Sequence, residues 1–314
     1  MSAVQQPPNP RDLRVQRAVR AVYGQQDVTC ERAVEPLVGH TRRAAEHDCV
    51  FVRGARPGFL TVLLDALVDL IDTGLVAKAA AVAHSAGVAP AVLGAGPEAG
   101  AIVHERLPDS FHPLQPHQLR DAEVLRSAVQ AKRALHAGPS MPVDRDVFDD
   151  VEQWSQLAAA AGAELPVDYT SMRERVRKAG AALRAAGRDA RPCHRDGSPS
   201  NIMLGPGGQV RLVDFDFAGN ADPHHDIAAM LVETCQLDDE WRRAGEQIDG
   251  RPDEQRLARY RLNAIADDLA VGSWALLVGA RGVGAEYTRY GQWRLLRCRY
   301  ALQHRNFESW LRRV

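Results

Sequence analysis

Residues 192–227 read PCHRDGSPSNIMLGPGGQVRLVDFDFAGNADPHHDI and hold the most informative side chains of this chain. The stretch contains a His-Arg-Asp triplet that ends at Asp196, and Asn201 follows five positions later. A short apolar run then ends in two further acids, Asp214 and Asp216. This concentration of carboxylates and amides predicts a chemical site.

A hairpin is predicted within this stretch. Residues 205–208 (GPGG) predict a turn, so the apolar segments 202–204 and 210–213 on either side are expected to pair. Such pairing brings Asn201 and Asp214 close together.

These residue types suit phosphoryl transfer, in which the protein mainly positions groups and compensates charge. Asp196 is the expected general base, which takes the proton of an acceptor hydroxyl. Asn201 and Asp214 are the expected Mg²⁺ ligands, because hard cations prefer oxygen donors. Asp216 is expected to be either a second metal contact or an acid that faces the substrate. The competing interpretation is a polar surface loop.

The pattern HxDxxxxN followed by a strand that ends in D-F-D resembles the aminoglycoside phosphotransferase and choline kinase superfamily. The resemblance implies an α+β, two-lobed, protein-kinase-like fold with Mg²⁺ and ATP or GTP as cofactors. His194 is expected to shape the loop through backbone contacts rather than to transfer a proton. Asp222 and Asp226 are expected to act as turn and helix caps.

Two lobes are expected. Residues 1–107 form a small nucleotide-binding lobe of mixed strands and helices, with 1–10 as a loose tail, and 108–314 form a helical lobe for catalysis and acceptor binding. Short strands are predicted at 35–39, 49–53 and 101–104. Helices are predicted at about 12–22, 59–71, 72–86, 116–136, 144–161 and 171–186, and from 226 to the C-terminus.

The resemblance also implies nucleotide-binding positions in the small lobe. Gly39 and Thr41 fall in the stretch that resembles the family's phosphate loop. Arg53 is the expected cation for the α- and β-phosphates, because arginine binds phosphate bidentately. Glu105 and Leu107 belong to the linker on which adenine usually bonds to the backbone.

The helix after that cation should offer it a glutamate, but the expected position falls near Val76. Asp65, Asp69 and Asp72 are candidate substitutes on roughly one helical face. They are equally well interpreted as a solvated polar face. A pseudokinase with an impaired small lobe, acting as a binding or regulatory protein, is therefore an alternative to an active enzyme.

The sequence says less about which compound accepts the phosphoryl group. Glu233 and Trp274 fall near positions that choline kinases use, and aromatic faces with acids suit a cationic head group. The competing interpretation is that the aromatic residues are packing core. A small amino alcohol is slightly favoured, an aminoglycoside or other natural product or a peptide Ser/Thr hydroxyl comes next, and no acceptor is selected.

The composition of the chain bears on its possible partners, metal sites and location. The net charge is −1, which disfavours nucleic acid as a partner. The five cysteines are scattered without metal-binding spacing. No apolar run approaches the ~18 residues that span a bilayer, and no signal core begins the chain. A cytoplasmic protein without a membrane partner is expected, and the oligomeric state is left open.

Overall fold

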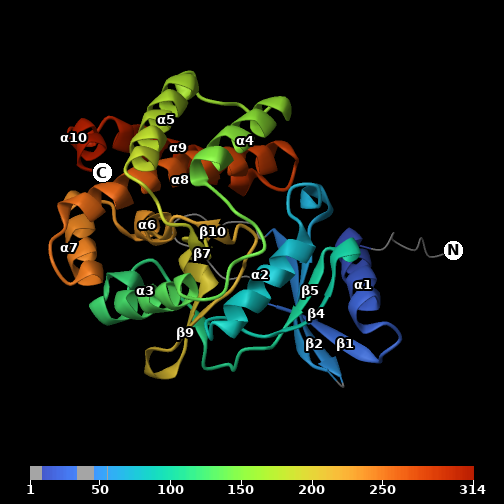
Figure 1. The fold of residues 1–314 in the computed structure, drawn as a ribbon. Helices are drawn as coiled ribbons and strands as arrows, with labels where there is room; N and C mark the ends of the chain where they lie inside the picture. The colour runs from blue at the N-terminus through green and yellow to red at the C-terminus, as the bar shows by residue number, and fades with distance from the viewer. Residues whose placement is uncertain (1–8, 34–45, 55) are drawn as a thin grey trace.

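The computed structural model describes residues 9–33, 46–54 and 56–314 (Figure 1). Gly39, Thr41 and the predicted strand at 35–39 lie outside the described residues. The described chain forms a small sheet lobe followed by a larger helical lobe.

The small lobe is built on a five-stranded antiparallel sheet in the order β1-β2-β3-β5-β4. The first helix, α1 (Pro10–Tyr23), packs on one face, where Ala18 joins a cluster with Val50 and Leu60. The second helix, α2 (Thr73–Ser85), covers part of the other face. The strands are β1 (Val28–Arg32), β2 (His47–Gly54), β3 (Gly58–Leu63), β4 (Val92–Gly96) and β5 (Ala101–His104).

The helix predicted at 59–71 is wrong. This segment is β3 followed by a short 3₁₀ helix, Asp65–Leu67. Leu60 and Val62 are buried against α1, whereas Thr61 points to the opposite face. A nearly continuous apolar run fits a strand buried on both faces as well as a helix, so periodicity alone does not separate them.

The large lobe contains the helices predicted after the proline-rich connector, with shifted starts. The helix expected from 116 begins at Ala122, because the Asp121 carboxylate caps it by accepting bonds from two backbone N–H groups. The elements are β6 (His112–Pro113), α3 (Ala122–His136), α4 (Val147–Ala160), α5 (Tyr169–Ala185), α6 (Pro223–Thr234), α7 (Asp238–Asp249), α8 (Glu254–Ala280), α9 (Ala285–Leu302) and α10 (Phe307–Arg313).

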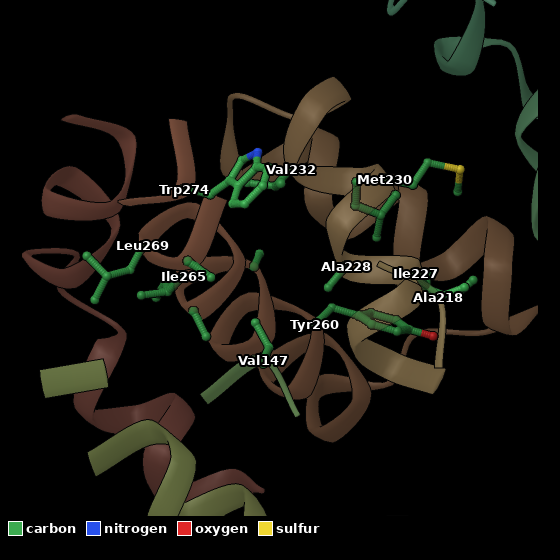
Figure 2. Packing of buried hydrophobic residues seen from close by; sticks show 14 of the residues in the cluster. Val147, Ala218, Ile227, Ala228, Met230, Val232, Tyr260, Ile265, Leu269 and Trp274 are labelled. Atoms are coloured by element: carbon green, nitrogen blue, oxygen red, sulfur yellow. The ribbon is translucent and has the colours of Figure 1, made fainter. Parts of the chain in front are cut away.

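Helix α8 is the centre of this lobe and packs against α4, α6, α9 and α10. Figure 2 shows Ile265 and Leu269 of α8 in one apolar cluster with Ile227 and Met230 of α6. By length and composition α8 is the one helix of the described chain that passes as a candidate membrane span, but 89% of its most apolar window is buried inside the fold. Core helices share these properties.

Candidate active site

The predicted hairpin is confirmed and brings Asn201 and Asp214 together. Strands β8 (Ile202–Leu204) and β9 (Val210–Leu212) pair antiparallel, and the Val213 N–H donates to the Asn201 carbonyl at 3.0 Å. Asn201 and Asp214 therefore leave the hairpin at the same end. The Asn201 Nδ2 donates to Asp214 Oδ2 at 3.3 Å and to Asp196 Oδ2 at 2.5 Å.

A second strand pair holds the two loops in place. Strand β7 (Arg191–Cys193) precedes Asp196 and pairs with β10 (Gly219–Ala221), which follows Asp216. The loop after β7 also approaches α6 so closely that a Cβ at Gly197 would lie 1.8 Å from the Ala229 carbonyl oxygen. Only glycine fits at that position.

Two residues of the site have unusual backbone dihedral angles. Among the described residues, Arg195 (φ 63°) and Asp214 (φ 68°) are the two non-glycine residues with positive φ. Such conformations cost energy and persist where the surroundings fix them, often at functional sites. The Asp196 carboxylate is fixed as well, since the Ser198 N–H donates to its Oδ1 at 2.6 Å.

The buried Asp226 carboxylate holds the backbone of the loop at His194 and Arg195. It accepts from the backbone N–H groups of His194 (3.2 Å) and Arg195 (2.8 Å), and it pairs with Lys132 at 2.7 Å and His136 at 2.9 Å. Burial by itself would raise the pKa of Asp226, but Lys132 and His136 hold it well below the usual range. The expectation that Asp226 is a helix cap is wrong, because its carboxylate bonds the loop that leads to Asp196. Asp222 is the cap of α6, as expected.

His194 shapes the loop as expected. Its Nε2–H faces the carbonyl oxygens of Val213 (2.9 Å) and Asp214 (2.8 Å), so the imidazole ties the two loops together. Burial and the nearby Lys132 charge lower the pKa of His194 and favour the neutral ring. A buried neutral imidazole occupied by backbone carbonyls is not arranged to transfer substrate protons.

Negative charge is concentrated at the end of the hairpin. Burial, followed by the carboxylate of Asp216, raises the pKa of Asp214 to about 8; Asp196 and Glu46 add to this, while His47 lowers it. The His47 Nε2 lies 3.6 Å from Asp216 Oδ1. Carboxylate and amide oxygens are the ligands that a hard divalent cation prefers, and the charge of such a cation would offset the repulsion between the crowded carboxylates.

Arg53 does not lie beside this acidic centre. It is six positions along β2 from His47, or ~20 Å at the ordinary rise of a strand. Its guanidinium pairs with Glu31 at 2.5 Å, and both side chains are exposed. The expectation that Arg53 contacts the α- and β-phosphates is therefore corrected, because phosphates held by the metal would lie beside the acidic centre. The strand that leads toward α2 is β3, and its Thr61 lies on the same face of the sheet as Arg53.

The three aspartates considered as partners for that cation serve other contacts. Asp65 pairs with Arg14 and Arg17, at 3.4 and 2.6 Å. Asp69 pairs with Arg281 of the large lobe at 2.6 Å, and Asp72 caps α2. None of them pairs with Arg53, so the substitution hypothesis is wrong. Asp69 instead connects the two lobes.

The linker position of Glu105 and Leu107 agrees with the prediction. Both follow β5 directly, and the Glu105 N–H donates to the Ala91 carbonyl at 2.8 Å. Between them Arg106 stacks on Phe51, with 4.5 Å between its guanidinium carbon and the ring centre. Their role in binding adenine stays a prediction.

Glu233 is engaged in a buried ion network. Arg294 bonds to it, Arg297 approaches it at 3.1 Å, and both arginines also bond Asp268. Burial would raise the pKa of Glu233, but these arginines hold it below its usual value. Both arginines contact the same carboxylate oxygen, Oε1, and so hold that side of the Glu233 carboxylate.

Trp274 lines an aromatic pocket that also includes Arg195, the residue before Asp196. The pocket is lined by the charged or polar residues Asp150, Arg195, His225 and Asp267, by the aromatic residues Trp154, Phe217 and Trp274, and by neighbouring aliphatic residues. The ring centres of Trp154 and Phe217 lie 4.9 and 5.2 Å from that of Trp274, with edge-to-face geometry. The Trp274 Nε1 is buried and has no hydrogen-bond partner within the described part of the chain.

Sequence reasoning missed Asp150 and Trp154, which come from α4. They lie more than forty positions before Asp196, and in the sequence they belong to an ordinary amphipathic helix pattern. Asp150 bonds the Arg195 guanidinium, which also donates to the Phe217 carbonyl at 3.0 Å. The His-Arg-Asp triplet was the available signal, because an arginine buried next to Asp196 needs a carboxylate partner.

A family model described as the phosphotransferase enzyme family (APH) matches residues 72–261, more than half of the chain. No curated protein gives a significant match.

Several solved structures share the fold. A choline/ethanolamine kinase family protein from Mesorhizobium loti superposes with a TM-score of 0.75 at 21% identity, over 96% of this chain and 97% of that one. The choline kinase LicA from Streptococcus pneumoniae gives 0.71 at 18% identity, over 93% and 98%, and a LicA complex with AMP gives 0.73 at 17%, over 97% and 100%. APH(2")-IIia in complex with GDP and kanamycin gives 0.61 at 16%, over 92% and 99%. The two-lobed kinase-like α+β fold is thereby confirmed.

Proposed function

Because the chain belongs to the phosphotransferase enzyme family, we propose that it transfers the γ-phosphoryl group of ATP or GTP to a hydroxyl of a small molecule, with Mg²⁺ as cofactor. One observation carries this proposal: Asp196, Asn201 and Asp214 meet at one end of a hairpin through direct hydrogen bonds. The AMP and GDP complexes of the structural neighbours support a nucleotide donor.

The residues of the acidic centre suit the metal. Asn201 uses its Nδ2 toward Asp196 and Asp214, which leaves its amide oxygen for a cation. Asp214 and Asp216 would complete the protein ligands. When bound, Mg²⁺ neutralises the developing charge on the phosphates.

Asp196 is placed to act as the general base. Its two carboxylate oxygens are held by Ser198 and Asn201, so the carboxylate has a fixed orientation toward the end of the hairpin. A positioned base of this kind takes the proton of the acceptor hydroxyl as that oxygen attacks phosphorus. The hydrogen bonds from the His194 and Arg195 N–H groups to the buried Asp226 carboxylate hold the backbone of this loop in place.

The acceptor is proposed to enter from the aromatic pocket. Three aromatic rings and the carboxylates of Asp150 and Asp267 line it, and rings with acids suit a small ammonium group. An amino alcohol is therefore the first acceptor to test. Asp150 and Asp267 are already paired with arginines, so the rings must supply much of the recognition.

One observation favours the second candidate, a pseudokinase that binds without turnover. In the described part of β2 and β3, no lysine or arginine lies beside Asp216; His47 stands there instead. A kinase-like site without a cation at the phosphates binds nucleotide but transfers slowly.

A nucleotide-consumption screen separates the two. The protein is incubated with Mg²⁺ and ATP or GTP against amino alcohols, amino sugars and hydroxyl peptides, and product is followed by mass. Phosphorylated acceptor supports the enzyme. Mg²⁺-dependent nucleotide binding with no product in any arm supports the pseudokinase, and no binding in wild type contradicts both.

A further inference from the structure

Arg145 is fixed beside the acidic centre by its backbone. It lies between α3 and α4, and its N–H donates to the Asn220 carbonyl at 2.9 Å. The Asn220 N–H in turn donates to the Val143 carbonyl at 2.8 Å. Asn220 belongs to β10, which begins three residues after Asp216. Arg145 therefore sits on a connection that is tied to the segment after the acidic pair.

The aliphatic part of the Arg145 side chain packs directly against Gly219. A Cβ at Gly219 would lie 2.8 Å from the Arg145 Cγ, so a larger residue there would displace the side chain. The charges that act on the guanidinium are Asp150 and Asp216, which attract it, and Arg195, which repels it. The chain thus makes room for a cation between the acidic centre and the aromatic pocket.

This cation has no partner within residues 9–33, 46–54 and 56–314. The Arg145 guanidinium makes no hydrogen bond or ion pair with any of them, and its Nε is buried. Arg195 next to it differs, since Asp150 and the Phe217 carbonyl satisfy its terminal nitrogens. A buried guanidinium nitrogen without a partner costs free energy, and an anion that accepts a hydrogen bond from it removes that cost.

We propose that Arg145 binds the phosphoryl group that is transferred, so that the large lobe supplies the positive charge for it. This inference rests on the proposed function. The planar guanidinium matches two phosphate oxygens at once, and Arg145 lies near the acids that would hold the metal. In the described small lobe, the His47 side chain lies beside this centre, 3.6 Å from Asp216 Oδ1.

The step is balanced. The acceptor oxygen forms a bond to the γ-phosphorus while the bond from that phosphorus to the β–γ bridging oxygen breaks. The electron pair of the broken bond stays on the departing nucleoside diphosphate, and the hydroxyl proton goes to Asp196. Arg145 offsets the negative charge on the transferred group.

The test compares two nucleotides that differ by one phosphoryl group. Binding of Mg·ADP and of Mg·AMP-PNP is measured by calorimetry for wild type, Arg145→Gln and Arg145→Lys. We expect Arg145→Gln to lose roughly tenfold or more in affinity for AMP-PNP but not for ADP, because one charge-assisted contact is lost. We expect its kcat to fall by about 10²–10³, with partial recovery in Arg145→Lys.

Arg188→Gln is the matched control, because Arg188 pairs with Asp146, the residue next to Arg145. It should leave both affinities unchanged. Equal weakening of ADP and AMP-PNP in Arg145→Gln, or a change in the acceptor KM alone, would overturn the inference. A wild type that binds neither nucleotide would instead contradict the proposed function. If Arg145→Gln does not fold, Arg145→Lys carries the same comparison.

Discussion

The catalytic segment 191–226 and the small-lobe sheet differ in how their sites are made. In the segment, all three proposed catalytic residues lie within twenty positions, and one hairpin brings them together. In the sheet, the residue beside the acidic centre depends on how each strand runs: His47 at the start of β2 lies 3.6 Å from Asp216, whereas Arg53 lies six positions further along the same strand and pairs with Glu31. Local motifs fix local geometry, whereas a site shared between strands depends on the whole sheet.

The largest effect is expected where the segment is most acidic. Asp214→Ala removes a proposed metal ligand and should lower kcat/KM by more than about 10³-fold, because a bound metal stabilises several kcal/mol of transition-state charge. Turnover is measured at saturating Mg²⁺. Asp189→Asn, which changes an exposed acid, is the control. Retained activity in Asp214→Ala would remove Asp214 from the metal site.

Asp196→Asn should follow, with kcat lower by roughly 10²–10⁴-fold and nucleotide affinity little changed. The asparagine keeps the size of the side chain but cannot take a proton. Steady-state kinetics together with calorimetry separates the two quantities. Wild-type kcat in this variant would show that another group is the base.

Asp226→Asn tests how much the buried Asp226 carboxylate contributes to stability, not the phosphoryl transfer itself. It leaves Lys132 buried without its carboxylate and should lower the free energy of unfolding by about 3–5 kcal/mol, measured by urea denaturation. Because the pKa of Asp226 is held below its ordinary 3.8, its contribution is present at neutral pH and lost as the pH falls below about 4. The difference between wild type and variant should be constant from pH 7 to about 5 and shrink below that. The exposed Asp149→Asn is the control.

The smallest effect is expected on the sheet. Arg53→Gln breaks an exposed pair with Glu31, which is worth about 0–1 kcal/mol, and should change nucleotide affinity by less than about fivefold. Calorimetry with Mg·ADP checks this. A larger loss would restore Arg53 to the nucleotide site and weaken the contrast between the two regions.

The hairpin could be predicted because it depends on the turn residues between its strands. The α+β fold was predicted through the resemblance to the phosphotransferase and choline kinase superfamily, and the loop-shaping role of His194 was predicted as well. Sequence reasoning failed for 59–71, where an apolar run buried on both faces of a sheet looks like a helix. It also failed for Asp226, since its bonds to the loop join residues more than thirty positions apart. Asp150, Trp154 and Arg145 were missed because only the packed fold brings them to the catalytic segment.

The most direct test is a calorimetric titration of Mg²⁺ into the protein with saturating AMP-PNP, for wild type and for the double variant Asn201→Ala, Asp214→Ala. We expect a saturable Mg²⁺ signal in wild type beyond that of the nucleotide alone, and its loss in the double variant while both proteins stay folded. Equal Mg²⁺ binding by the two proteins would contradict this expectation.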